Sequence, residues 1–148
     1  MTSRRKAREL ALSCMYELEM AGNDPGVVID RTRMDQDVHG AAVTFLDDAV
    51  RLAWEYHEKT DKIIEKLATG WKLDRIARVD LSILRLAIVE LLIGIEDPTP
   101  PDPVVINEAV VLAKKFSTED SGKFINGILA SIMKEKEKYR EMLTSKNE

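Results

Sequence analysis

The sequence predicts an all-α protein, a single-domain bundle of about six to seven helices. Only 7 glycines and 5 prolines interrupt the 148 residues, and hydrophobic residues make up 45% while aromatics make up only 5%. Much of the remainder is Ala, Leu, Ile, Lys and Glu, which favour helices, and apolar residues recur with a helical period along most of the chain. The length suffices for one substantial core. We expect the domain to span residues 1–140, followed by a charged C-terminal tail at 141–148.

The first helix is expected over residues 4–21. Its apolar stripe has the spacing of one helical face and consists of Ala7, Leu10, Ala11, Cys14, Met15 and Leu18. Four cations, Arg4, Arg5, Lys6 and Arg8, precede its first acid. Because the helix dipole disfavours positive charge at an N-terminus, helix stability does not explain them. Two interpretations remain, a solubilising arm and an anchor for a polyanion.

The following segment is less regular. A turn at residues 22–26 leads into a short helix at 27–36 with Asp24 as its cap, and boundaries within residues 22–40 stay open. One long helix is then expected over 41–68, ended by Gly70.

Two polar features of this region have structural interpretations. His57 and Asp61 are spaced as an i,i+4 pair, for which a surface ion pair is expected, without a third metal ligand nearby. After Gly70, Asp74 is expected to cap a single turn through Ile76.

The most apolar helix is expected over residues 80–95. A helix of this composition is covered on nearly all sides, with Arg85 and Glu90 marking a less buried edge. Four of the five prolines follow within residues 96–103, which predicts a stiff, extended connection.

Two further helices are expected, at 104–116 and from Thr118 onward. Gly127 lies inside the second, where glycine costs roughly 1 kcal/mol relative to alanine, so we expect a neighbouring helix to approach it closely. From Lys134 the chain is expected to be a solvated helical extension.

The stretch that joins these two helices, residues 114–129, combines aromatic and basic side chains. They are Lys114, Lys115, Phe116, Lys123 and Phe124. Ser117 followed by Asp120 fits a hydroxyl cap with an acid three residues on. Both phenylalanines are interpreted either as core, with solvated lysines around them, or as aromatic faces beside a helix N-terminus that suit a ligand with phosphates and bases.

Composition and motifs exclude several classes of protein. One cysteine and two histidines allow neither an internal disulfide nor a zinc site of Cys and His alone. We find no phosphate loop and no hydrolase motif, and no signal peptide is apparent. The most apolar run, residues 86–93, is too short to span a bilayer. We expect a cytoplasmic protein without metal or cofactor, and three classes remain: an RNA-binding module, a protein-interaction bundle, or an enzyme with an unmarked site.

Three stretches together resemble the bacterial transcription antitermination factor NusB family. RRKARELALSCMYELE (4–19) resembles its Arg-rich opening helix, and WKLDRIARVDLSILRLAIVELL (71–92) is similar to a central family pattern. VVINEAVVLAKKFSTEDSGKFINGIL (104–129) is similar to a third, specific family signature. Residues 22–70 match only as helices of suitable length.

The resemblance implies a helical bundle that acts by binding rather than by catalysis. Members of the family bind boxA RNA of ribosomal RNA leaders as single strands, together with ribosomal protein NusE, in the RNA polymerase antitermination complex. The positions that it assigns to RNA are Arg4, Arg5, Arg8, Phe116, Asp120, Lys123 and Phe124. It assigns Asp80 to the NusE interface, with Arg85 and Glu90 further along the same helix.

Some alternatives remain open. Tyr16 could stack on a base or pack, as could the two phenylalanines. Relatives occur as monomers and as dimers, so a homodimer is one alternative. The fold also occurs as an N-terminal domain of RNA cytosine methyltransferases, but a chain of 148 residues without a Gly-rich donor loop disfavours that function. A non-catalytic protein-interaction module is the main alternative function.

Overall fold

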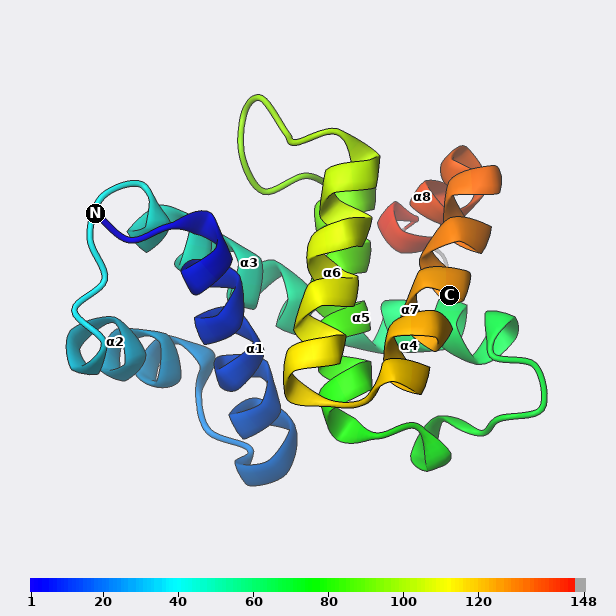
Figure 1. The fold of residues 1–148 in the computed structure, drawn as a ribbon, viewed down its shortest axis with the longest axis horizontal. Helices are drawn as coiled ribbons and strands as arrows, with labels where there is room; N and C mark the ends of the chain where they lie inside the picture. The colour runs from blue at the N-terminus through cyan, green and yellow to red at the C-terminus, as the bar shows by residue number, and fades with distance from the viewer. Residues whose placement is uncertain (146–148) are drawn as a thin grey trace.

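The computed structural model describes residues 1–145, and these residues form eight α-helices, a 3-10 turn and no strands (Figure 1). The helices are α1 (Arg4–Ala21), α2 (Pro25–Asp35), α3 (Ala42–Glu55), α4 (His57–Leu67), α5 (Arg78–Leu92), α6 (Asp102–Phe116), α7 (Glu119–Lys134) and α8 (Lys136–Thr144), with the 3-10 turn η1 (Leu73–Arg75) between α4 and α5. The predicted all-α class is confirmed, and the described residues form one helix more than the six to seven that were expected.

Helix α5 is the centre of the bundle. Twelve of its 15 residues are buried, because α1, α3, α4, α6, α7 and α8 all pack against it. In Figure 1, α1 to α3 lie on one side of α5 and α6, and α4, α7 and α8 lie on the other. The prediction of a helix covered on nearly all sides is therefore confirmed, and Gly94 ends it in a left-handed conformation, with φ 92°.

The expected single helix over 41–68 is wrong, because the chain turns at Tyr56 between α3 and α4. Helix α3 packs against α1 and α5, whereas α4 packs against α5 and α8, so one straight axis could not serve both. At the bend the His57 ring stacks on Trp54, with 4.2 Å between ring centroids, and Thr60 Oγ1 donates to the His57 carbonyl at 3.0 Å.

Three other local expectations have different outcomes. Asp24 caps α2 as predicted, and its side chain accepts from Val27 N. Asp74 instead lies inside η1 and makes no capping bond. The predicted close approach at Gly127 is wrong, since a Cβ there would meet no atom within 4 Å. The close approach is at Gly122, where a Cβ would stand 3.3 Å from Lys114 Cγ of α6.

Helix α8 packs more closely against the bundle than the sequence suggested. A solvated extension was expected from Lys134, but α8 buries Tyr139 and Leu143, which stand four residues apart on one face against α4 and α5. The helix continues to Thr144, so only part of the predicted tail at 141–148 lies beyond it, and residues 146–148 lie outside the described residues.

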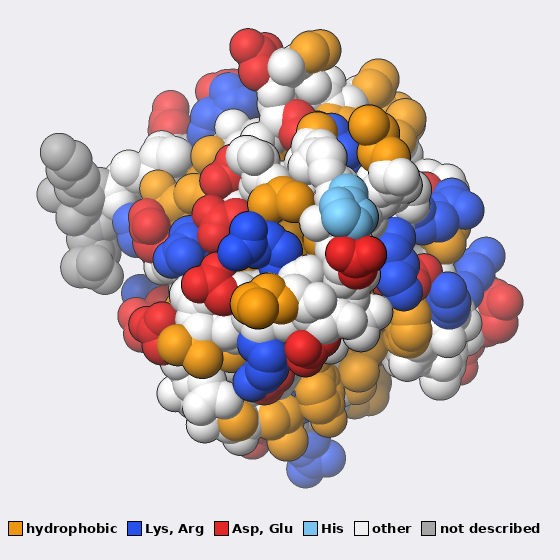
Figure 2. Space-filling view, turned by 90° about the vertical axis from the view of Figure 1, so that its left-hand side faces the viewer, with side chains coloured by type: hydrophobic (Ala, Val, Ile, Leu, Met, Phe, Trp, Pro, Cys, Tyr) orange, Lys and Arg blue, Asp and Glu red, His pale blue; other side chains and the backbone are white. Residues whose placement is uncertain are grey.

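The surface mixes charges of both signs. Figure 2 views the side of the molecule that carries the N-terminus and α2, and on this face Lys and Arg are interspersed with Asp and Glu. Within residues 1–145, no helix combines the length and the apolar character needed to cross a bilayer.

Candidate nucleic-acid interface

Arg4, Arg5 and Arg8 of α1, here called the arginine row, reach toward carboxylates from later parts of the chain. Arg5 donates two hydrogen bonds to the Glu108 carboxylate of α6, at 3.2 and 2.8 Å. Arg4 Nε donates to Glu96 Oε2, in the loop before α6, at 2.7 Å. The cations that looked unpaired in the sequence are thus already engaged within the protein.

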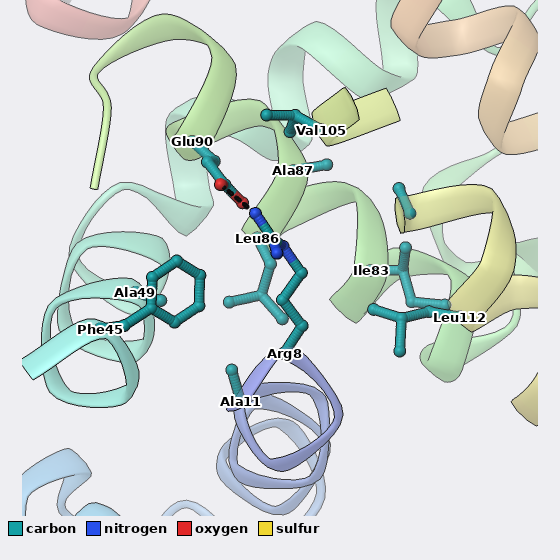
Figure 3. A pocket seen from close by; sticks show the side chains of 11 residues that line it. Arg8, Ala11, Phe45, Ala49, Ile83, Leu86, Ala87, Glu90, Val105 and Leu112 are labelled. Carbon is teal, nitrogen blue, oxygen red and sulfur yellow. Dashed lines mark hydrogen bonds and ion pairs between the residues drawn. The ribbon is translucent and has the colours of Figure 1, made fainter. Parts of the chain in front are cut away.

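Arg8 points inward instead of outward. Figure 3 shows its side chain passing Leu86 to reach Glu90 of α5, beside an apolar hollow between α1, α3, α5 and α6. Its Nη2 lies 2.6 Å from Glu90 Oε2, and its guanidinium stands 5.1 Å from the ring centroid of Phe45. The side chain is 11% exposed, against 59% for Arg5. Arg8 is therefore held as a structural cation.

The pKa values of the partner carboxylates are shifted in opposite directions. Hydrogen bonds from the row lower the pKa of Glu96 and of Glu108 below the usual range. Burial raises the pKa of Glu90, and the bond with Arg8 offsets this only in part. At neutral pH the two outer pairs therefore carry charges of both signs, so this surface is less positive than the arginines alone would make it.

The C-terminal end of α6 lies next to α1. Lys115 Nζ donates to Glu9 Oε2 at 2.8 Å, and Phe116 and Tyr16 line one surface hollow. Their exposed fractions are 45% and 40%. The two rings are thus available to a ligand in the space between α1 and α6.

The α6–α7 turn is built by hydroxyl groups. Thr118 is the cap of α7, and its Oγ1 accepts from Ser121 N at 3.0 Å. The predicted cap, Ser117, is wrong by one residue, because Ser117 ends α6 and its Oγ lies 2.8 Å from Ser121 Oγ. Ser121 Oγ in turn donates to Asp80 Oδ2 of α5 at 2.7 Å. This chain of bonds ties the turn to the start of the central helix.

Phe116, Asp120, Lys123 and Phe124, here called the aromatic corner, surround this turn. Asp120 and Lys123 are exposed in the first two turns of α7, whereas Phe124 is half-buried against the core. The described part of the chain shows no ion pair at Asp120 or Lys123. The corner differs in this respect from the arginine row.

The residues that the resemblance relates to the partner are all buried. Asp80, Arg85 and Glu90 are 6%, 2% and 7% exposed. The expectation that Arg85 and Glu90 mark a less buried edge is wrong, because each forms an ion pair inside the bundle. In this conformation they support the surface from beneath and do not present their charges to a partner.

Arg85 joins three helices. It donates to both oxygens of Asp61 on α4, at 2.9 and 2.7 Å, and to Glu19 of α1 at 2.7 Å. The predicted surface pair of His57 and Asp61 is therefore wrong. Asp61 is buried because it neutralises Arg85, which sequence spacing within one helix could not reveal.

Trp71 and Arg75 were not among the site residues predicted from the sequence. They line a hollow of about 370 Å³, here called the Trp71 groove, together with Asp80, Asp120 and Phe124. Trp71 is 58% exposed. Its position in a short polar connection, off any apolar stripe, was the signal available in the sequence.

The chemistry of this surface is that of binding. Guanidinium, ammonium and aromatic groups are the usual contacts of phosphates and unstacked bases. Among the residues that the structure describes, no group of three His, Cys, Asp or Glu side chains is placed to hold a metal ion. The fold and the site together define a helical bundle in which α1, the C-terminal end of α6 and the start of α7 carry a candidate nucleic-acid surface.

Comparison with known proteins identifies the family. The NusB family model matches residues 5–134. The transcription antitermination protein NusB of Symbiobacterium thermophilum is 40% identical over 140 residues, which cover 89% of this chain and 90% of that protein. The chain therefore belongs to the NusB family.

Solved structures agree with this assignment. NusB of T. maritima superposes with a TM-score of 0.81 at 33% identity, covering 93% of this chain and 97% of that one. A chain in a crystal structure of antitermination factors NusB and NusE in complex with dsRNA has a TM-score of 0.79 at 29% identity, covering 89% of this chain and 96% of that one.

Proposed function

We propose that this protein is a transcription antitermination factor that binds boxA-type single-stranded RNA of ribosomal RNA leaders together with ribosomal protein NusE. It works in the cytoplasm within the RNA polymerase antitermination complex, and it is a binding factor, not an enzyme. The observation that carries the proposal is the family match over residues 5–134, which spans the surface described above except for Arg4. Relatives over the same length are antitermination proteins.

The contacts divide by chemistry. Arg5, the most exposed member of the row, and Lys123 bind phosphates, which fixes the strand without reading its sequence. Phe116 and Tyr16 offer exposed rings on which unstacked bases rest. Arg4 contributes from the rim of the same surface, while Arg8 keeps α1 in place through Glu90.

The charge balance explains why a partner is needed. The protein carries a formal net charge of −4, and the exposed arginines share their charge with glutamates, so a single phosphate-binding surface is weak. NusE supplies a second surface on the same strand, and two weak sites on one strand give much tighter binding than either alone.

One titration tests the function. Labelled boxA-like RNA and a scrambled control are titrated with the protein, with and without NusE, over a range of salt concentrations. If about 3 to 5 phosphates are neutralised on a single strand, the log–log salt slope should be about −2 to −3.5. NusE should tighten binding to the boxA-like RNA more than to the control. A flat salt dependence, or equal affinity with and without NusE, contradicts the proposal.

A pair of double variants controls for charge. Replacing Arg4 and Arg5 with Ala should weaken RNA binding, because both side chains lie on the proposed surface. Replacing Arg31 and Arg33 with Ala removes the same charge from α2, which carries none of the proposed RNA contacts, and should have little effect. If both double variants lose RNA affinity equally, the arginine row acts only through the net charge of the protein.

A further inference from the structure

The fold brings lysines from two distant parts of the chain to one place, between α4 and α8. Lys59, Lys62 and Lys66 recur at the spacing of one helical face along α4, and Lys138 joins them from α8. These four residues, here called the lysine surface, line a hollow of about 580 Å³. Glu141 is the one acidic residue that the described chain contributes to the lining. Four lysines against one glutamate give a formal charge of +3, on a protein whose net charge is −4.

Two of these lysines lie against each other. The Nζ atoms of Lys66 and Lys138 stand 5.9 and 5.4 Å from the ring centroid of Tyr139, which is itself buried. Contact with the Lys138 ammonium lowers the pKa of Lys66, as expected where one cation stands next to another. Glu135 pairs with Lys138 at 3.1 Å, whereas within residues 1–145 no carboxylate forms an ion pair with Lys66. The fold thus holds two ammonium groups together beside a single carboxylate.

The lysine surface differs from the arginine row in its partners and in its place. Each arginine of the row pairs with a glutamate, whereas Lys59 Nζ donates to the carbonyl oxygen of Ser145. A neutral carbonyl does not cancel the charge of an ammonium group, so this charge remains available to an anion. Helices α4 and α8 also lie on the other side of α5 and α6 from α1 (Figure 1), so a ligand of the arginine row does not cover the lysine surface.

We propose that the lysine surface is a second nucleic-acid site, which binds backbone phosphates of RNA that lies outside the boxA segment. Lys66 and Lys138 hold one phosphate between their ammonium groups, and Lys59 contacts a neighbouring phosphate. The proposal rests on the RNA binding proposed above and extends it. The first surface selects the strand, and the second holds the continuation of that strand without regard to its sequence.

The composition of the hollow favours phosphates over an acidic segment of another protein. Among the described residues that line it, none is aromatic, and Met142, which is 37% exposed, is the one apolar side chain. Protein interfaces depend on buried aromatic and apolar anchors, whereas phosphate binding needs only cations. Without exposed rings the surface also lacks a platform on which bases stack. Its contacts are therefore expected to be independent of RNA sequence.

RNAs of two lengths test the second site. A short boxA-like RNA occupies only the first surface, whereas the same RNA extended by about twelve uridines on each side can pass around a domain of this size. The wild type should bind the extended RNA about fivefold more tightly at low salt, in the range expected for two or three exposed ion pairs. Its log–log salt slope should be steeper by about 1.5 to 2, because each phosphate contact on a single strand adds about 0.7.

Three double variants locate this gain in affinity. Lys66→Gln with Lys138→Gln should abolish most of the gain and leave binding of the short RNA unchanged. Lys66→Arg with Lys138→Arg keeps both charges and should keep the gain. Arg31→Gln with Arg33→Gln removes the same charge from α2, as the matched control, and should also keep it. All three variants should melt close to the wild-type temperature, because the four side chains are exposed.

The outcomes separate the two proposals. If neither RNA binds the wild type at low salt, the proposed function falls and the second site falls with it. If the short RNA binds but the extension adds nothing, or if Lys66→Gln with Lys138→Gln keeps the gain, only the second site is overturned. An equal loss of the gain in the α2 control would mean that net charge alone acts, and this also overturns it.

An oligoglutamate provides the test of the other class of ligand. If it binds the wild type but not Lys66→Gln with Lys138→Gln, while the RNA extension adds nothing, the lysine surface takes an acidic peptide and the phosphate site is overturned. If the extended RNA gains affinity through these lysines and the oligoglutamate binds at least tenfold more weakly than that RNA, the proposal is supported.

Discussion

The arginine row of α1 and the aromatic corner of α6 and α7 differ in how their polar groups are satisfied. Each guanidinium of the row has a carboxylate partner, namely Glu96, Glu108 or Glu90. The corner and its adjoining groove have the opposite character, with an exposed Lys123, exposed rings and the unpaired oxygen of Asp80. Charge visible in a sequence is therefore a poor measure of charge available to a ligand, because the fold can use it internally.

Within the row, the largest effect is expected from Arg8→Ala. This change leaves Glu90 buried without its cation, and breaking a buried pair in this way costs about 3 kcal/mol. Urea unfolding measures the loss. Arg5→Ala, with an exposed pair, should change stability by less than about 1 kcal/mol. Equal effects of the two variants would remove the distinction between a structural and a surface arginine.

A smaller effect is expected from releasing Arg5. Glu108→Gln removes the charge that pairs with it, so its guanidinium becomes free for phosphate, and RNA affinity should rise by about threefold. Fluorescence anisotropy at fixed salt measures this. Glu137→Gln on α8 makes the same change in net charge, next to Arg140, and should leave affinity nearly unchanged. A rise of equal size in both variants would mean that overall charge matters and pairing does not.

The smallest effect concerns pH. Because burial raises the pKa of Glu90 in the folded state, folding favours its protonated form. Its contribution to the free energy of unfolding is therefore fully present below the unfolded pKa, near 4.3, and is lost as the pH rises through the folded pKa. Relative to Glu90→Gln, the wild type should gain stability as the pH falls through this window. Urea melts at several pH values measure the difference, and a slope of opposite sign would mean that Arg8 dominates over burial.

The two outer pairs of the row have the opposite pH dependence. The pKa values of Glu96 and Glu108 are lowered by their arginines, so their contribution is present above the unfolded pKa and is lost as the pH falls through the folded pKa. Lowering the pH therefore weakens the Arg4–Glu96 and Arg5–Glu108 pairs, whereas it favours the buried carboxyl group of Glu90.

Local patterns predicted much of the fold. The apolar stripe of α1, the continuous apolar content of α5 and the cap at Asp24 each depend on residues that are close together in the sequence, and all three are confirmed. The bend at Tyr56 and the burial of Tyr139 were missed because they depend on which helices lie alongside α4. For the site, the candidate residues remain predictions. Trp71 was overlooked because its groove combines residues 71–80 with residues 118–124, which come together only in the folded chain.

By itself, the sequence determined the all-helical class, the central helix and the family, since helical periodicity and the family motifs are properties of neighbouring residues. Only the tertiary structure decided which charges are available. Arg85 pairs with Asp61 and Glu19, and Arg8 with Glu90, across separations of 24 to 82 residues. An ion pair depends on distances of a few ångströms between side chains, and such distances exist only after the helices have packed.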